Sequence, residues 1–151
     1  GEFKNDLKDG YGVYLYQNGD KYEGYFVKSL FRGYGKYTFF DSSMYEGEWF
    51  DNKKTGRGKY IFNDGSYYQG NFLEGKFHGK GKQFSSNGKM IYEGEFKDDK
   101  FNGIGKYFYD NGDTYEGDFL NGEFHGQGKY LFEDGSLFHD GLWENGNPIN
   151  N

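Results

Sequence analysis

The chain has no cysteine, no alanine and a single proline, Pro148. Without cysteine, disulfides and thiolate metal sites are excluded. No apolar run approaches the ~18 residues that a membrane-spanning helix needs, which excludes such a helix. The 24 acidic residues outnumber the 18 basic ones, and the net charge of −6 disfavours a nucleic-acid partner, because nucleic acids are bound by basic surfaces. The same charge weakens attraction to an anionic membrane surface.

Aromatic residues and glycine are abundant instead. The chain contains 17 Phe, 16 Tyr, 2 Trp and 27 Gly, against a mean hydropathy of −1.05. Such low hydropathy is typical of disordered chains, but disordered chains are poor in aromatic residues. The aromatic rings therefore supply the apolar surface that this chain buries when it folds.

One pattern repeats along the chain with a nearly constant period. A Tyr-Glu/Gln-Gly-x-Phe/Trp block begins at Tyr22 and returns at 45, 68, 92 and 115, and a degraded copy begins at His139. A period of this length is typical of stacked supersecondary units. We predict one array over residues 1-151, with repeats at 22-44, 45-67, 68-91, 92-114 and 115-138 and partial repeats at 1-21 and 139-151. Gly1-Glu2-Phe3 matches the third to fifth residues of the repeat, so the sequence begins inside a repeat. We therefore expect this array to be a fragment of a longer protein.

Alternation along each repeat predicts strands. With positions counted from the first Tyr, positions 1, 3 and 5 carry ring, Gly and ring, and positions 14, 16 and 18 alternate again, as in Gly58-Tyr60-Phe62. Asp-Gly or Asn-Gly follows at positions 20 and 21, a strong hairpin signal. Glycine at position 12 is expected to take a positive φ. The fold class is therefore all-β: an elongated, twisted, single-layer antiparallel meander, a β-hairpin repeat solenoid of about 23 residues per repeat.

Charged residues predict the register of this sheet. Acidic or amide side chains recur at position 2, as in Glu23 and Glu46, and lysine fills position 15 in five repeats, as in Lys36. If these positions share one face, opposite charges lie across neighbouring strands and the rings at positions 1, 5, 16 and 18 all lie on the other face. This register requires a loop with an odd number of residues at the Asp-Gly corner.

At these residues the chain resembles the MORN (membrane occupation and recognition nexus) repeat family. The resemblance rests on Tyr-Glu-Gly-Glu-Trp at 45–49, Tyr-Glu-Gly-Glu-Phe at 92–96 and Gly-x-Gly-Lys-Tyr at 56–60 and 126–130. Gln83 and Ser85 depart from it where rings are expected, and Asp41-Ser42-Ser43 lacks the turn glycine. The resemblance implies a non-catalytic module of cytoskeletal, ciliary or membrane-contact proteins, also attached to some enzymes. Its partners would be protein segments, further copies of the array or acidic phospholipids.

The ring face is the main candidate for a partner site, because a single-layer sheet has no second layer to cover it. The predicted partner groove is lined by Tyr22, Phe26, Tyr45, Trp49, Tyr60, Tyr68, Phe72, Tyr92, Phe96, Tyr107, Tyr115 and Phe119. A rim for this groove is predicted at Phe31, Phe77, Phe101 and Phe124.

Other sites are predicted with less support from the residues. The candidates for lipid binding are Lys36, Lys59, Lys82, Lys106 and Lys129, which their acidic neighbours are expected to neutralise. No catalytic group, cofactor site or metal site is predicted: the Glu rows recur in every repeat, whereas catalysis needs one unique pair. His78 and His125 lie two repeats apart, too far to share a metal ion.

The C-terminal segment is the predicted site of self-association. Pro148 cannot donate to a sheet, so we expect the array to end there with an unpaired edge. Dimer contacts are predicted at Tyr130, Phe132, Phe138 and Trp143. The expected function is thus a cytoplasmic, cytoskeletal scaffold that binds a protein segment or a second copy, associated with the cytoskeleton or with membranes. Recruitment to membranes by phosphoinositides, and an accessory role beside an enzyme outside this sequence, remain alternatives.

Overall fold

The structure is a computed structural model that describes residues 3–4 and 7–150 of the chain. The described residues form strands and turns, with no helix among them. The chain divides into two compact units, Gly1–Lys76 and Phe77–Asn151. Gly1, Glu2 and Asn151, which belong to the predicted partial repeats, lie outside the described residues.

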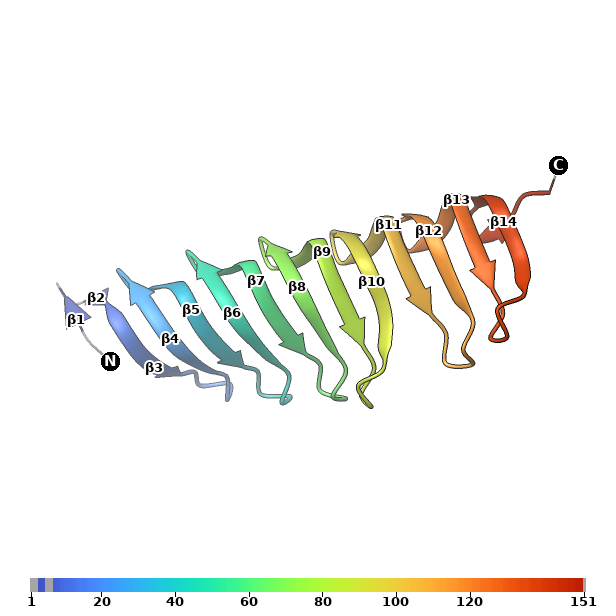
Figure 1. Ribbon diagram of the computed structural model, residues 1–151. Coiled ribbons are helices and arrows are strands. Elements are labelled where there is room, and N and C mark those ends of the chain that lie inside the picture. Colours follow the sequence, from blue (N-terminus) through green and yellow to red (C-terminus); the bar gives the residue numbers. More distant parts are fainter. Residues whose placement is uncertain (1–2, 5–6, 151) are drawn as a thin grey trace. The chain divides into compact units, whose positions relative to one another are not determined.

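The first unit is an antiparallel meander in which neighbours in the sheet are also neighbours in the sequence (Figure 1). The short strands β1 (Phe3–Lys4) and β2 (Leu7–Lys8) pair with each other in a small sheet of their own. The main strands are β3 (Gly10–Leu15), β4 (Lys21–Val27), β5 (Leu30–Thr38), β6 (Met44–Phe50), β7 (Lys53–Ile61) and β8 (Tyr67–Leu73).

The second unit repeats this plan, and β9 begins at the boundary between the units. Its strands are β9 (Lys76–Phe84), β10 (Met90–Lys97), β11 (Lys100–Phe108), β12 (Thr114–Leu120), β13 (Glu123–Leu131), β14 (Leu137–Glu144) and β15 (Asn147–Pro148). Each complete repeat supplies two strands. The predicted all-β antiparallel meander of hairpin repeats is therefore confirmed.

The strand register agrees with the one predicted from the charges. Lys36 on β5 lies opposite Glu23 on β4 and opposite Glu46 on β6. Along β6, Tyr45 and Trp49 are buried while the intervening side chains are exposed. Within four of the hairpins a β-bulge or irregularity between positions 3 and 5 shifts the pairing by two residues, which keeps each side chain on its face. Rings and charges are thus sorted onto opposite faces, named here the ring face and the charge face.

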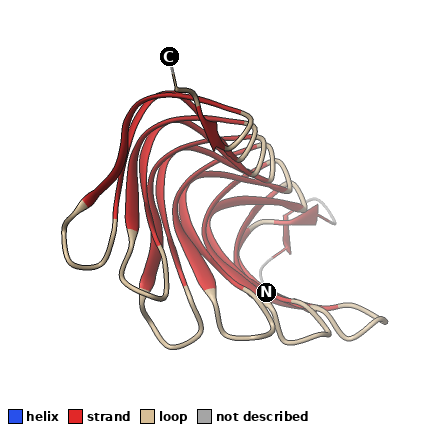
Figure 2. Ribbon diagram, turned by 90° about the vertical axis from the view of Figure 1, so that its right-hand side faces the viewer, coloured by secondary structure: helices blue, strands red, loops and turns tan. Residues whose placement is uncertain are grey.

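Two kinds of turn alternate along each unit, one at each end of the strands (Figure 2). The wide turns contain the Asp-Gly or Asn-Gly pairs. Between β5 and β6 the loop has five residues, 39–43, and it is closed by hydrogen bonds from the backbone nitrogen of Ser42 to the oxygen of Phe39 (3.0 Å) and from the nitrogen of Phe39 to the oxygen of Ser43 (2.9 Å). The odd loop length confirms the prediction. Ser42 takes the positive φ (78°) that glycine takes in the other repeats.

The tight turns occupy positions 7 and 8 and were not identified from the sequence. Both residues of each turn have positive φ, as in the type I′ turns that connect two antiparallel strands through two residues. Glycine is present at position 8 in only some repeats, so the usual signal is incomplete. The turns are Lys28-Ser29, Asp51-Asn52, Glu74-Gly75, Asp98-Asp99, Asn121-Gly122 and Asn145-Gly146.

The turns give a prediction about stability. Ser42 of the wide turn 39–43 has a φ of 78°, a conformation that is unfavourable for serine and not for glycine. We expect Ser42→Gly to raise the free energy of unfolding by about 0.5–1 kcal/mol, because the relief of strain exceeds the entropy that glycine adds to the unfolded chain. The shift of the urea midpoint measures this. Asn52→Gly, in the tight turn that follows, should instead destabilise, since the Asn52 side chain accepts a hydrogen bond from the Phe31 nitrogen at 2.7 Å. Equal effects of the two changes would contradict the argument.

Candidate interaction site

Tyr92 shows how the ring face is built. Its side chain is fully buried, and its ring stacks on Phe101 at 3.9 Å between centroids with planes 10° apart. Phe119 of the next repeat meets it edge-on at 5.2 Å, and its hydroxyl donates to the backbone oxygen of Glu95 at 2.7 Å. Offset and edge-on aromatic pairs of this kind add to the energy of apolar burial. Tyr22, Tyr45 and Tyr115 are likewise enclosed by rings from their own and the next repeat.

Glycines form the floor beneath these Tyr rings. A Cβ built on Gly105 would overlap the hydroxyl of Tyr92 and lie 2.6 Å from its Cε2 atom. A Cβ on Gly94 would lie 2.9 Å from the same hydroxyl and 2.6 Å from the backbone oxygen of Ile104. Glycine at positions 3 and 14 therefore lets the Tyr ring lie flat on the sheet. The predicted positive φ at position 12 is also present, for example at Gly103 (90°).

This packing places most of the predicted groove residues in the core instead of on a surface. The position-1 tyrosines have no exposed surface and the rings at position 5 are exposed by 6% or less, because the glycine floor lowers the Tyr rings and the next repeat covers them. The buried residues of the predicted groove are Tyr22, Phe26, Tyr45, Trp49, Tyr68, Phe72, Tyr92, Phe96, Tyr115 and Phe119. Tyr60 and Tyr107 are half-buried.

The predicted rim residues also turn inward. Phe31 stacks on Tyr22 at 3.7 Å and Phe124 stacks on Tyr115 at 3.8 Å, in both cases with planes 6° apart. Phe77 lies edge-on to Phe96 at 6.1 Å. These position-10 rings form a layer over the tyrosines, so the structure does not place them as a rim.

The exposed part of the ring face is its outer row, the aromatic residues at positions 16 and 18. Neighbours in this row contact each other, as Tyr37 and Phe39 do at 4.6 Å. Of this row, Tyr60 and Tyr107 were predicted for the groove and Tyr130 and Phe132 for dimer contacts, although the period-2 alternation marks the whole row. The outer row comprises Tyr37, Phe39, Tyr60, Phe62, Tyr107, Tyr109, Tyr130 and Phe132, all half-buried or exposed.

Two buried carboxylates support the outer row and were missed in the sequence. Asp20 is 6% exposed, and its Oδ2 accepts a hydrogen bond from the Tyr37 hydroxyl at 2.6 Å while Oδ1 accepts one from the Phe40 nitrogen at 2.8 Å. Asp113 binds the Tyr130 hydroxyl in the same way at 2.7 Å. Burial, and then the hydrogen bond to Asp20, raise the pKa of Tyr37. These bonds fix the orientation of the two outer-row tyrosines.

One cavity opens beside each of these tyrosines, and the two cavities are lined by the same repeat positions, with Phe138 added in the second. Each has a volume of about 310 Å³, the lower end of the range of about 300–1,000 Å³ seen for ligand pockets. The cavity of the first unit is lined by Tyr16, Phe31, Tyr37, Phe39, Trp49, Asn52 and Lys54. The cavity of the second unit is lined by Tyr109, Phe124, Tyr130, Phe132, Phe138, Trp143, Gly146 and Pro148.

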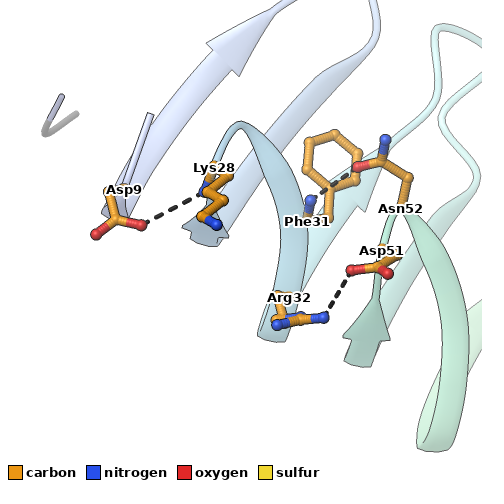
Figure 3. Close-up of polar contacts among 6 residues, drawn as sticks. All are labelled: Asp9, Lys28, Phe31, Arg32, Asp51 and Asn52. Carbon is orange, nitrogen blue, oxygen red and sulfur yellow. Dashed lines mark hydrogen bonds and ion pairs between the residues drawn. The ribbon is translucent and has the colours of Figure 1, made fainter. Parts of the chain in front are cut away.

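Contacts between successive hairpins hold the wall of the first cavity (Figure 3). The backbone nitrogen of Phe31 donates to Oδ1 of Asn52 at 2.7 Å, and the Asn52 nitrogen donates to the oxygen of Phe31 at 3.1 Å. Arg32 donates to Oδ1 of Asp51 at 2.9 Å and lies over the ring of Phe50 at 4.3 Å. Each tight turn is therefore tied to the hairpin before it.

The lysines predicted for lipid binding lie on the charge face among acidic side chains. Lys106 is 3.8 Å from Glu116 and Lys82 is 4.0 Å from Glu93, both solvent-exposed pairs of the kind that contribute little to stability. Lys59 lies over the ring of Tyr67 at 4.4 Å. Lys36 is flanked by carboxylates on both neighbouring strands, and Lys129 lies opposite Glu116 and Asp140.

The predicted dimer residues gather at one point on the ring face of the second unit. The ring of Phe138 is 5.4 Å from that of Tyr130, 5.6 Å from that of Phe132 and 6.4 Å from that of Trp143. Trp143 is buried, whereas Phe138 is about half exposed.

The edge expected to be unpaired after β14 is partly paired. Asn145-Gly146 makes the same tight turn as the complete repeats, and β15 places Pro148 opposite Trp143. The backbone nitrogen of Ile149 donates to the oxygen of Leu142 at 2.8 Å, next to the proline that cannot donate.

Neither a metal-binding cluster nor a membrane-spanning helix is found among the described residues. No three His, Asp or Glu side chains of this part of the chain are arranged to hold a metal ion. The same residues include no helix with the length and hydropathy of a transmembrane span.

Comparison with known families identifies the repeated unit. A family model described as the MORN repeat matches six segments that together span most of the chain: 1–21, 22–44, 45–67, 68–90, 92–114 and 115–137. A search among curated proteins finds no match to the chain.

Proposed function

Because the chain belongs to the MORN repeat family, a non-catalytic type of repeat that contacts proteins or membranes, we propose that it is a scaffold that binds an extended protein segment along its outer row. The observation that carries this proposal is the pair of equivalent cavities beside Tyr37 and Tyr130, where the rings of the outer row are half-buried or exposed. Aromatic rings held rigidly beside a cavity are the usual anchors of protein interfaces.

Charge favours a protein partner over a lipid surface. The net charge is −6, and each position-15 lysine faces an acidic or amide side chain across the sheet, as Lys59 faces Glu46 and Gln69. An anionic bilayer would have to displace these neighbours before it gained from the lysines. We place the scaffold in the cytoplasm with the cytoskeleton as its setting, and a second copy of the chain is an alternative occupant of the outer row near Phe138.

The experiment selects linear peptides from a random displayed library on the immobilised chain and measures the affinity of the best one by calorimetry. We expect Phe39→Gln with Phe62→Gln to weaken binding by roughly 30-fold, the effect of losing an aromatic anchor worth about 2 kcal/mol. Leu73→Gln, at an exposed leucine on the charge face, is the matched control and should bind as the parent does.

Two results would overturn this function. If the affinity of the selected peptides is unchanged by the outer-row substitutions, the peptides bind elsewhere on the molecule. The membrane alternative would be favoured if the chain binds anionic vesicles, if this binding weakens as salt is added, and if Lys59→Glu abolishes it. Sedimentation velocity tests whether a second copy of the chain binds near Phe138. Self-association should then weaken with Phe138→Gln.

A further inference from the structure

Lys54 breaks the pattern of the ring face. Position 10 is phenylalanine in four repeats, at Phe31, Phe77, Phe101 and Phe124, and it is Lys54 in the repeat that begins at Tyr45. In three of these repeats the position-10 ring stacks flat on the position-1 tyrosine, as Phe31 does on Tyr22. Here an ammonium group takes the place of the ring.

The ammonium of Lys54 is surrounded by aromatic rings. Its Nζ lies 5.7 Å from the ring centroid of Phe39 and 5.8 Å from those of Tyr45 and Tyr60. Distances within about 6 Å allow cation–π attraction. Lys54 also lies opposite Trp49 in the sheet. The charge is therefore held on the ring face, at the wall of the cavity of the first unit.

Asn52 adds a second donor to the same wall. Its Oδ1 is occupied by the Phe31 nitrogen, so its amide nitrogen is the group it can offer to a ligand, and this nitrogen points away from Phe31 (Figure 3). The cavity thus combines two donors, one of them charged, with aromatic walls.

The equivalent cavity of the second unit lacks both donors. Position 8 is Gly146 where the first unit has Asn52, and position 10 is Pro148 where the first unit has Lys54. The tryptophan at position 5 and the rings at positions 16 and 18 are retained. The two cavities therefore differ in charge while sharing their volume and most of their walls.

We propose that the cavity at Lys54 binds the carboxylate of a protein segment, with the apolar side chain beside that carboxylate lying against the rings of Tyr37 and Phe39. This inference rests on the proposed function and adds the chemistry of the segment: an acidic group adjoining an aromatic or aliphatic residue. A carboxylate carries one charge and accepts at two oxygens, which matches one ammonium and one amide. A lipid phosphate is usually bound by several cations, and the net charge of −6 opposes an anionic bilayer.

The two tryptophans provide a built-in reporter. Trp49 and Trp143 are the only tryptophans of the chain, each lines one cavity, and each indole nitrogen donates to a backbone oxygen, of Gly35 at 3.1 Å and of Gly128 at 3.0 Å. The two indole N–H signals in a nitrogen–proton NMR spectrum therefore report the cavities separately, and Trp143→Phe assigns them. The probes are N-acetylphenylalanine, which carries a carboxylate, and its neutral amide.

We expect N-acetylphenylalanine to titrate the Trp49 signal about tenfold more tightly than the amide does, because a charge-assisted hydrogen bond is lost with the amide. Lys54→Met keeps the apolar stem and should remove this preference. Lys53→Met, the adjacent lysine on the other side of β7, should retain it. The Trp143 signal in the same spectra should respond to both probes alike, and it verifies that each variant is folded.

The outcomes separate this inference from the proposed function. Equal affinity of the two probes at Trp49, or a preference for the carboxylate that survives in Lys54→Met, overturns the carboxylate site and leaves the scaffold function standing. Failure of both probes at both tryptophans, together with failure of the peptide selection, overturns the scaffold function as well. A third outcome would assign Lys54 to lipid binding and overturn the protein carboxylate. In that case vesicles containing phosphatidylinositol bisphosphate shift the Trp49 indole signal and N-acetylphenylalanine does not. The shift caused by the vesicles is then lost in Lys54→Met.

Discussion

Gly105→Ala is expected to lower the free energy of unfolding by about 3 kcal/mol or more, a large effect for the addition of one methyl group. The new Cβ would overlap the hydroxyl and Cζ of Tyr92. That ring cannot move aside, because Phe101 stacks on it at 3.9 Å, Phe119 meets it edge-on at 5.2 Å and its hydroxyl is bonded to Glu95. The clash must therefore separate the tyrosine from the sheet or distort the strand. Urea denaturation followed by circular dichroism measures the loss.

Gly88→Ala is the matched control for this change. Gly88 has a φ of 86° in a wide turn, and a Cβ there would meet nothing within 4 Å. The alanine then costs only the backbone strain of a left-handed conformation, about 1–2 kcal/mol. If Gly105→Ala costs no more than Gly88→Ala, the glycine floor does not determine how the tyrosines pack.

The sequence predicted the strands and their register because two independent patterns agree. Rings alternate with other residues at period 2, and Glu23, Lys36 and Glu46 complement one another only if these positions share a face. The tight turns were not predicted because Lys28-Ser29 and Asp98-Asp99 lack the glycine that marks a type I′ turn. Their backbone conformation is imposed by the strands on either side.

How deeply each ring is buried could not be predicted from the sequence. Alternation assigns Tyr45 and Tyr60 to the same face, yet Tyr45 is fully buried and Tyr60 is half-buried. The difference arises from contacts between repeats, where Phe72 of the next repeat lies edge-on to Tyr45 at 4.9 Å. The predicted groove therefore included the core, and the exposed outer row was only partly identified. Asp20 and Asp113 were missed because their partners lie 17 residues further along the chain.

Alkaline pH is expected to unfold the chain as it rises from 10 towards 12. Burial raises the pKa of Tyr22 and of Tyr115 from 10.0 to about 12, and burial also raises the pKa of Tyr45 and Tyr92. Over this range the unfolded chain releases the phenolic protons while the folded chain keeps them. The folded state then binds more protons, so its stability falls as pH rises. The stabilisation is complete below pH 10 and is lost as pH passes the pKa values of the folded state.

Tyrosinate absorbance and circular dichroism, recorded together during the titration, test this coupling. The buried tyrosines should ionise in the same step in which the strands are lost, because each hydroxyl donates to a backbone oxygen, as that of Tyr115 does to Asp118 at 2.7 Å, and a phenolate has no proton to donate. Tyr115→Phe removes one of the titrating groups and should make stability fall less steeply with pH, even though it loses this hydrogen bond and lowers stability below pH 10. Ionisation of all the tyrosines near pH 10 with the strands intact would mean that the position-1 rings are accessible to water. The outer row would then not be the only part of the ring face open to a partner.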